Sequence, residues 1–181
     1  ASGSPRFCNM GNFMRLPHAE NAEGLDFAIV GIPFDTAASF RAGARFGPNG
    51  IRNISAMIKP NNVAMGVNIM DELKGADLGD VPVIPDYIHE TYAAIENTLT
   101  GVLNEGAVPI SLGGDHAITL GELRAIYKKH GKVALVHFDS HLDLCDAVFG
   151  QKYNHGTPFR RAMEEGLIDP LYSDWYERFF I

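Results

Sequence analysis

The run from Val133 to Phe138 constrains the fold of this chain more than any other segment. It reads VALVHF, so it is nearly continuous in apolar residues and rich in β-branched side chains. Such a run predicts a buried strand, and its lack of polar alternation favours a parallel sheet that is covered on both faces. We therefore expect an α/β fold with this strand in its interior.

Three metal-capable side chains follow this predicted strand at alternate positions, namely Asp139, His141 and Asp143. In an extended backbone they project to one side, roughly 6.5–7 Å apart per two-residue step. Ligand sites of open parallel sheets gather at the carboxyl ends of the strands. Two carboxylates and one imidazole suit a divalent ion such as manganese better than a thiolate site would. The alternative interpretation is a polar strand end that caps a following helix.

Further strands and helices alternate along the rest of the chain. Residues 26–32, 75–80 and 107–112 have the composition of strands, and residues 119–130 and 158–165 that of helices. A short amphipathic helix is expected from Asn49, with Ile51, Ile54, Met57 and Ile58 on one side, and a long helix is expected from Pro85 and Asp86 to about Asn104. This order predicts right-handed, parallel βαβ units. We expect a three-layer α/β/α domain over residues 26–181, preceded by an N-terminal arm over residues 1–25.

Composition and charge narrow the classes of protein that fit. The 181 residues are 46% hydrophobic and 20% charged, as in one globular domain. The net charge of -7 argues against nucleic acid as a partner and is compatible with a cationic substrate. Two cysteines, Cys8 and Cys145, favour a reducing compartment, and no run has the length of a membrane span. We expect a cytoplasmic protein, with mitochondrial import of a processed precursor as the open alternative.

A second candidate ligand follows the strand predicted over residues 107–112. There the sequence reads Gly113-Gly-Asp-His116, and the glycines allow a tight turn. If this strand neighbours the one that ends at Phe138, His116 comes within reach of the three residues described above. Asp115 has two open interpretations, as an orienting partner of the site or as a helix N-cap.

Other charged and imidazole side chains have less specific interpretations. His137 alternates with Phe138 and is expected to point to the opposite face and to be structural. His18, His89 and His130 are expected at the surface. Arg41 and Arg45 lie in the loop after the first strand, where a substrate-loop role, a subunit-contact role and a structural role are open, the structural one being favoured.

Taken together, the motifs Gly113-Gly-Asp-His116 and Val136-His-Phe-Asp-Ser-His-Leu-Asp143 resemble those of the ureohydrolase family, which includes arginases, agmatinases and guanidinobutyrases. The resemblance extends over most of the chain, and further segments are similar to the agmatinase branch in particular. These segments are Phe13–Pro17, Asp35-Thr36, Arg41–Pro48, Ile51-Arg52 and Asn154–Arg161.

The resemblance implies a dinuclear manganese centre, or a centre with another divalent ion such as nickel, that hydrolyses guanidinium groups to urea and an amine. By match to the family motifs, His116 would bind one ion and His141 the other, while Asp139 would bridge them. Asp143 would ligate the same ion as His116 and accept a hydrogen bond from the attacking hydroxide. His155 matches a proton-shuttling histidine near the leaving amine. This chemistry is sound, since metal ions lower the pKa of water and a histidine of near-neutral pKa can protonate the departing nitrogen.

The resemblance also implies a small cationic guanidino substrate and a homo-oligomer, a trimer or a hexamer. Arginases carry an asparagine two residues after the aspartate that Asp143 matches, and this chain has Cys145 there. That difference favours agmatine, which would yield putrescine. The substrates 4-guanidinobutyrate, guanidinopropionate, proclavaminate-type compounds and guanidine stay open.

The chain departs from the family pattern in its last part. The family's second aspartate motif, Ser-x-Asp-x-Asp-x-x-Asp-Pro, is absent, as is a downstream glutamate that contacts guanidinium, and residues 171–181 do not match the family's next strand. We therefore expect a sequence shortened at its carboxyl end. One alternative is an inactive subunit that acts through interactions. Another is a metal-dependent deacetylase of the same broad fold, which the Gly-Gly-Asp-His motif fits less well.

Overall fold

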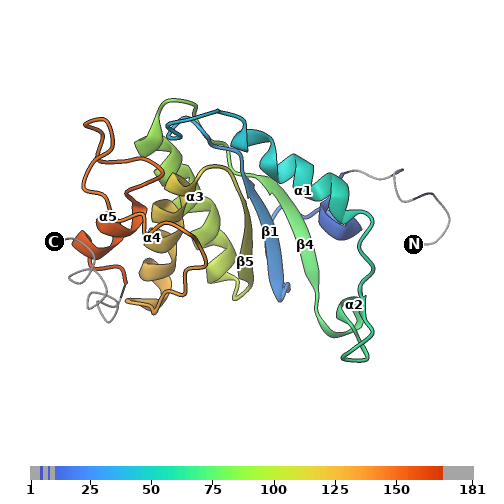
Figure 1. Ribbon diagram of the computed structural model, residues 1–181. Coiled ribbons are helices and arrows are strands. Elements are labelled where there is room, and N and C mark those ends of the chain that lie inside the picture. Colours follow the sequence, from blue (N-terminus) through green and yellow to red (C-terminus); the bar gives the residue numbers. More distant parts are fainter. Residues whose placement is uncertain (1–4, 6–7, 9–10, 169–181) are drawn as a thin grey trace.

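The chain forms three layers, with a parallel sheet between helices (Figure 1). The computed structural model describes residues 5, 8 and 11–168. Its main sheet has three strands in the order β4 (Gly75–Asp80), β1 (Phe27–Ile32) and β5 (Val108–Gly113), and both neighbours of β1 run parallel to it. The expected α/β/α class is confirmed. The predictions for the first residues of the arm and for residues 169–181 lie outside the described residues.

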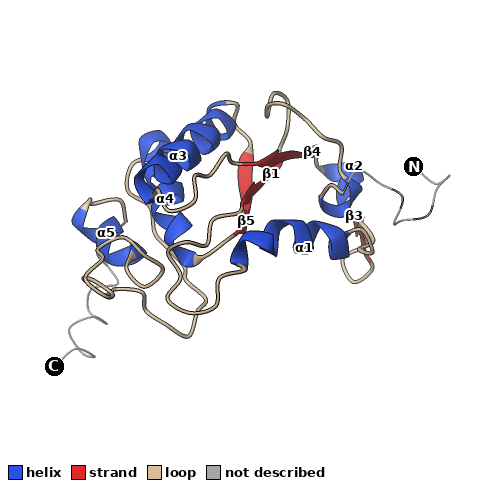
Figure 2. Ribbon diagram, turned by 90° about the horizontal axis from the view of Figure 1, so that it is seen from above, coloured by secondary structure: helices blue, strands red, loops and turns tan. Residues whose placement is uncertain are grey.

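Helices cover both faces of this sheet, as Figures 1 and 2 show. On one side are α3 (Ile88–Asn104), α4 (Thr119–His130) and, beyond α4, α5 (Pro158–Glu164), and on the other is α1 (Gly47–Ser55). The smaller elements are η1 (Phe13–Arg15), η2 (Ala44–Phe46), η3 (His116–Ile118), β2 (Asn61–Asn62), β3 (Val67–Asn68) and α2 (Ile69–Glu72). Among the described helices, none combines the length and the apolar character needed to cross a membrane.

The core lies between the sheet and the α3–α4 layer. The predicted apolar stripe of α3 is buried, including Tyr92, Ile95 and Leu99. These side chains belong to one cluster with Val30 and Ile32 of β1. The three- and four-residue spacing along α3 therefore identified the face that packs against the sheet.

The helix α3 begins at Ile88, three residues later than the expected start at Pro85. Asp86 has a φ angle of 67°, outside the right-handed helical region. The Ile84 N–H donates to the Thr91 hydroxyl at 3.0 Å, which closes a turn before the helix. The proline thus belongs to the turn and not to the first helical residues.

The helix α1 presents a polar face to the sheet. Its expected apolar side is largely exposed, with 69% exposure at Ile54 and 61% at Met57, just past the helix. Arg52 and Ser55 are buried instead, and Arg52 pairs with the buried Asp77 of β4. The helix was predicted correctly, but the buried ion pair turns its apolar side away from the sheet.

The strand predicted over residues 133–138 is not formed. Val133 makes one isolated parallel bridge, to Ile168, and within the described part of the chain β5 pairs only with β1. The segment is nevertheless alternately exposed: Leu135 packs against the core, whereas Val136 is 68% and Phe138 95% exposed. A strand requires a neighbour that accepts and donates its backbone hydrogen bonds, and within the described residues this segment has such a neighbour only at Val133.

The described part of the N-terminal arm lies on its own domain. Leu16 is buried. The backbone N–H of Phe13 donates to the Asp77 carboxylate at 2.8 Å, and that of Met14 donates to the Ser55 hydroxyl at 2.8 Å. The arm therefore covers the α1 and β4 side of the sheet.

Candidate metal centre and adjoining histidine

The candidate site lies at the carboxyl ends of β1 and β5. Ile32 lies opposite Gly113 in the parallel register, and the Asp115 N–H donates to the Phe34 carbonyl at 2.7 Å. A side chain at Gly114 would bring its Cβ to 2.3 Å from the Ile32 oxygen, so only glycine allows this close approach. The Gly-Gly pair thus lets the chain pass the end of β1 and deliver His116.

Asp115 connects η3 to the loop after β1 at this edge of the sheet. One of its carboxylate oxygens accepts from the Ala117 N–H at 2.9 Å and caps η3, and the other accepts from the Ala37 N–H at 3.0 Å. Burial raises the pKa of this carboxyl group, against the effect of the two N–H donors. The N-cap interpretation is confirmed, and the second bond attaches the loop after β1.

Four possible metal ligands converge beside η3. One donor atom from each of His116, His137, Asp139 and Asp143 lies within 4.8 Å of the other three. The His116 Nδ1 is hydrogen-bonded to the Asp143 carboxylate and lies 3.8 Å from an oxygen of Asp139. Two imidazoles and two carboxylates are a suitable donor set for a borderline divalent ion such as manganese or zinc. The residues present therefore fit a single such ion.

The side chain of Phe159 in α5 supports both imidazoles. It is buried, and its ring centroid lies 4.5 Å from that of His137 and 5.2 Å from that of His116, with edge-to-face geometry in both cases. The Phe159 N–H also donates to the carbonyl of Asp143 at 3.3 Å. Asp143 has a φ angle of 49°, which reverses the chain so that its carboxylate returns to His116.

The structure places His137 beside Asp139, among the possible ligands. Its Nε2 lies 3.5 Å from an oxygen of Asp139, so both side chains point to the same cluster. Residues two apart in an extended segment share a side, and this parity already related His137 to Asp139 in the sequence. The apolar run around His137 had favoured a structural role instead.

His141 takes a different position from the four converging donors. Its side chain is 77% exposed, and its Nδ1 lies 3.5 Å from the other oxygen of Asp139. The backbone N–H of His141 donates to that same oxygen at 3.0 Å, and this bond lowers the pKa of the Asp139 carboxyl group. The structure thus brings together His116, Asp139 and Asp143 among the predicted ligands, and leaves the His141 ring outside the cluster.

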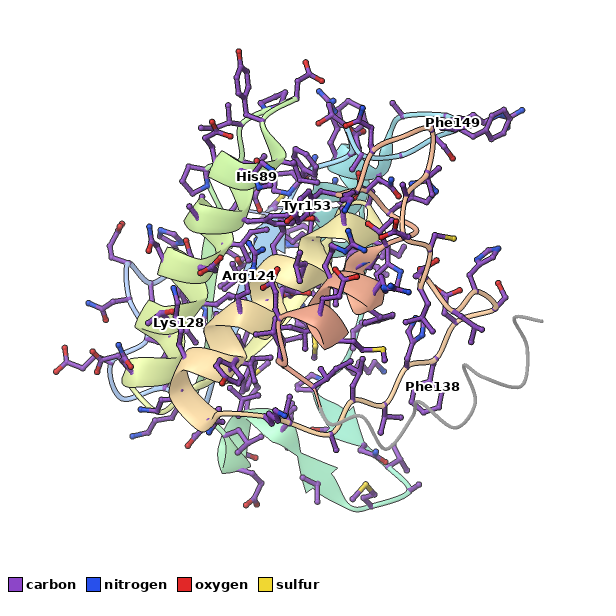
Figure 3. All side chains as sticks on the ribbon, turned by 90° about the vertical axis from the view of Figure 1, so that its left-hand side faces the viewer. His89, Arg124, Lys128, Phe138, Phe149 and Tyr153 are labelled. Carbon is purple, nitrogen blue, oxygen red and sulfur yellow. The ribbon has the colours of Figure 1, made fainter. Side chains whose placement is uncertain are left out.

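His155 lies on a loop that is attached to two other parts of the fold. Its neighbour Tyr153 contacts His89 edge-on, with ring centroids 4.6 Å apart (Figure 3). The His155 Nδ1 lies 2.8 Å from the Ala37 carbonyl, and its Nε2 lies 3.2 Å from the Ser39 hydroxyl. Because Ala37 is also bonded to Asp115, a chain of hydrogen bonds links His155 to the residue before His116. Sequence reasoning had no signal for Ser39.

Arg45 has a structural role in the same loop. Its Nε donates to the buried carboxylate of Asp35 at 2.7 Å. That bond lowers the pKa of Asp35, and further N–H donors from Gly43 and Arg45 act in the same direction. Arg41 lies with its guanidinium 5.1 Å from the ring of Phe40.

Comparisons with known proteins agree with this architecture. The model of the arginase family matches residues 25–174. A guanidinobutyrase of Pseudomonas aeruginosa is 49% identical over 168 residues, which are 91% of this chain and 53% of that protein. A mitochondrial agmatinase of Gallus gallus is 46% identical over 162 residues, which are 90% and 47% of the two chains. The chain thus spans about half the length of these curated relatives.

Solved structures give the same result. The proclavaminate amidino hydrolase from Streptomyces clavuligerus superposes with a TM-score of 0.86 at 39% identity, covering 92% of this chain and 57% of that one. A formiminoglutamase from Trypanosoma cruzi, described with Mn2+, gives a TM-score of 0.73 at 30% identity and covers 82% and 51% of the two chains.

Proposed function

The chain belongs to the arginase family, and on that basis we propose that it takes part in the hydrolysis of a guanidino compound to urea and an amine. The observation that carries the proposal is the convergence of His116, His137, Asp139 and Asp143 at the end of the sheet. The loop that bears His155 is joined to the same edge through Ala37 and Asp115.

The four converging side chains would hold manganese, and His141 is the candidate ligand of a second ion by match to the family motif. When bound, the metal supplies an activated water nucleophile at neutral pH. His155 would give a proton from its ring to the leaving nitrogen, which departs as a neutral amine. The Phe159 ring keeps two of the imidazoles in place by edge-to-face contact.

The proposed substrate is agmatine, a linear guanidino compound without an α-amino acid head. Cys145, in place of the asparagine that arginases carry, supports a substrate other than arginine. Relatives named agmatinase and guanidinobutyrase are 46% and 49% identical, so 4-guanidinobutyrate is the competing substrate. The two differ in the charge of the tail.

The experiment is urea release by the manganese-loaded chain on agmatine, 4-guanidinobutyrate and arginine. We expect urea from agmatine, and none from any compound with His116→Ala. Urea from 4-guanidinobutyrate alone would reassign the substrate, and urea from arginine would contradict the inference from Cys145.

A second candidate function is that of a non-catalytic subunit that binds metal and acts through interactions. The position of His141, whose ring lies outside the four converging donors, favours it. In that case the chain binds Mn2+ but releases no urea from any of the three compounds.

A further inference from the structure

We infer that Ser39 positions the ring of His155. Its hydroxyl stays hydrogen-bonded to Nε2 whether the imidazole is neutral or protonated. The inference deepens the proposed function, because the role of His155 in proton transfer rests on that function. The hydrogen bond itself can be tested independently of any activity.

The backbone around His155 is held from both sides. Asn154 is buried, its carboxamide oxygen accepts from the Gly156 N–H at 2.9 Å, and its NH2 donates to the Gln151 carbonyl at 2.9 Å. The buried Thr157 hydroxyl accepts from the Asn154 N–H at 3.1 Å. This network fixes the turn that carries the imidazole, so the ring has a defined place above the loop after β1.

The Ala37 carbonyl sets the tautomer of the ring. A carbonyl oxygen can only accept a hydrogen bond, and it lies 2.8 Å from Nδ1, so Nδ1 carries a proton. In the neutral imidazole Nε2 is then the acceptor. The position of the Ala37 carbonyl is fixed, because the N–H of the same residue donates to Asp115.

The Ser39 hydroxyl lies 3.2 Å from that acceptor nitrogen. A hydroxyl both donates and accepts, so Ser39 can donate to Nε2 of the neutral ring and accept from Nε2–H of the imidazolium. The ring can therefore gain or lose its proton without moving. The loop that carries Ser39 is held further along by the bonds from Gly43 and Arg45 to Asp35.

In the reaction, the Nε2–H bond breaks as the bond between the leaving nitrogen and the guanidinium carbon breaks. The proton, shared in a three-centre hydrogen bond between the Ser39 oxygen and the leaving nitrogen, passes to the electron pair of that nitrogen, and the Ser39 hydroxyl turns to donate to the freed Nε2. Ser39 is exposed, so solvent water can return a proton to the imidazole for the next cycle.

The test is the hydrogen-bonding state of the His155 ring nitrogens, read from imidazole 15N shifts in long-range 1H–15N spectra of the metal-free chain above pH 8. His155→Asn assigns the signals by their loss. We expect the Nδ1–H tautomer, with an Nε2 shift typical of a hydrogen-bonded acceptor. In Ser39→Ala the Nε2 signal moves to the value of an imidazole nitrogen that is bonded to water alone, and in Ser39→Thr it keeps the value of the intact chain.

Thr36→Val is the matched control, because it removes a hydroxyl of the same loop that accepts from the Asp86 N–H and not from the ring. It should leave the Nε2 shift unchanged. An unchanged Nε2 shift in Ser39→Ala, or an Nε2–H tautomer in the intact chain, overturns the inference.

Turnover gives a second readout. We expect Ser39→Ala to lower kcat roughly tenfold at nearly constant KM, less than the roughly 100- to 10,000-fold contribution of a positioned proton donor, and Ser39→Thr to restore it. If the chain releases no urea, the proposed function fails while the 15N shifts still decide whether Ser39 holds His155.

Discussion

At the scale of single residues, Arg52 satisfies a buried carboxylate on the α1 side of the sheet. Its guanidinium donates to both oxygens of Asp77, at 2.8 and 2.9 Å, and to the carbonyl of Gly79 at 2.9 Å. Arg52→Met keeps much of the volume and leaves Asp77 charged, buried and without its cation. We expect this substitution to lower the free energy of unfolding, measured in urea at pH 7, by about 3–5 kcal/mol.

The matched control is Lys128→Met. Lys128 pairs with Glu96 at 2.7 Å, but its side chain is 55% exposed (labelled in Figure 3). An exposed pair of this kind contributes about 0–1 kcal/mol. Equal losses in the two variants would show that burial does not govern the contribution of Arg52.

The cost of Arg52→Met should depend on pH. Burial opposes ionisation of Asp77, but hydrogen bonds from Arg52 and from the N–H groups of Phe13 and Gly79 outweigh it and hold the pKa below its usual value of 3.8. The stabilisation is therefore complete above that pH and is lost as the pH falls through the folded-state pKa. We expect the difference between the variant and the intact chain, measured by urea unfolding, to narrow as the pH falls below 3.8. A constant difference would contradict the assignment.

His137 and His141 can be distinguished by metal binding. The geometry of the cluster predicts that His137→Ala weakens Mn2+ binding by about tenfold or more, as loss of a supporting contact or ligand does. His141→Ala should have a smaller effect, since the His141 ring lies outside the four converging donors. Calorimetric titration measures both. The reverse order would show that the metal draws residues 139–143 into another arrangement, with His141 as the ligand that the family motif indicates.

At the scale of elements, the sequence predicted those whose stability is local or whose apolar face is buried in the core. The helices α3 and α4 and the strands β1, β4 and β5 appear where periodicity and turn residues placed them. The segment 133–138 has an equally strong pattern, but a strand also needs paired neighbours, which a local pattern does not report. The cluster of His116, Asp139 and Asp143 was predictable because each follows an apolar run.

The contact of Ser39 with His155 was not predictable, because it joins residues 116 positions apart. No local pattern encodes such a pairing. The two-residue spacing between His137 and Asp139 indicated that the two side chains lie on the same side. The apolar run around His137 nevertheless favoured a structural role.

The exposed side of segment 133–138 should promote self-association. Phe138 is 95% exposed and Val136 68%, and among the described residues Val133 is the one member of this segment that forms a backbone bridge. We expect Phe138→Ser to reduce self-association in sedimentation velocity at least severalfold. Phe149→Ser is the control, because Phe149 is 87% exposed on a different loop (Figure 3) and should matter less. Similar effects of the two would point to general hydrophobicity and not to this segment.

At the scale of the whole molecule, the donor cluster joins η3 to the segment after residue 136, so metal binding and folding are coupled. A metal that binds only the folded chain stabilises it by about 2.7 kcal/mol when its free concentration is a hundredfold above Kd. We expect Mn2+ to raise Tm in a concentration-dependent way and a chelator to reverse the change. His116→Ala should abolish the shift. A Tm that does not respond to Mn2+ in the intact chain would contradict the metal assignment.

The bond between His155 and the Ala37 carbonyl has a consequence for how the chain acquires its structure. It spans 118 positions, and closing so long a loop costs conformational entropy that short-range contacts do not. During synthesis, the loop after β1 leaves the ribosome long before its partner exists. Ala37 and Ser39 therefore stay exposed to solvent until residue 155 has been synthesised. In a pulse-labelled refolding reaction, the amide protons around this loop should be among the last to gain protection from exchange.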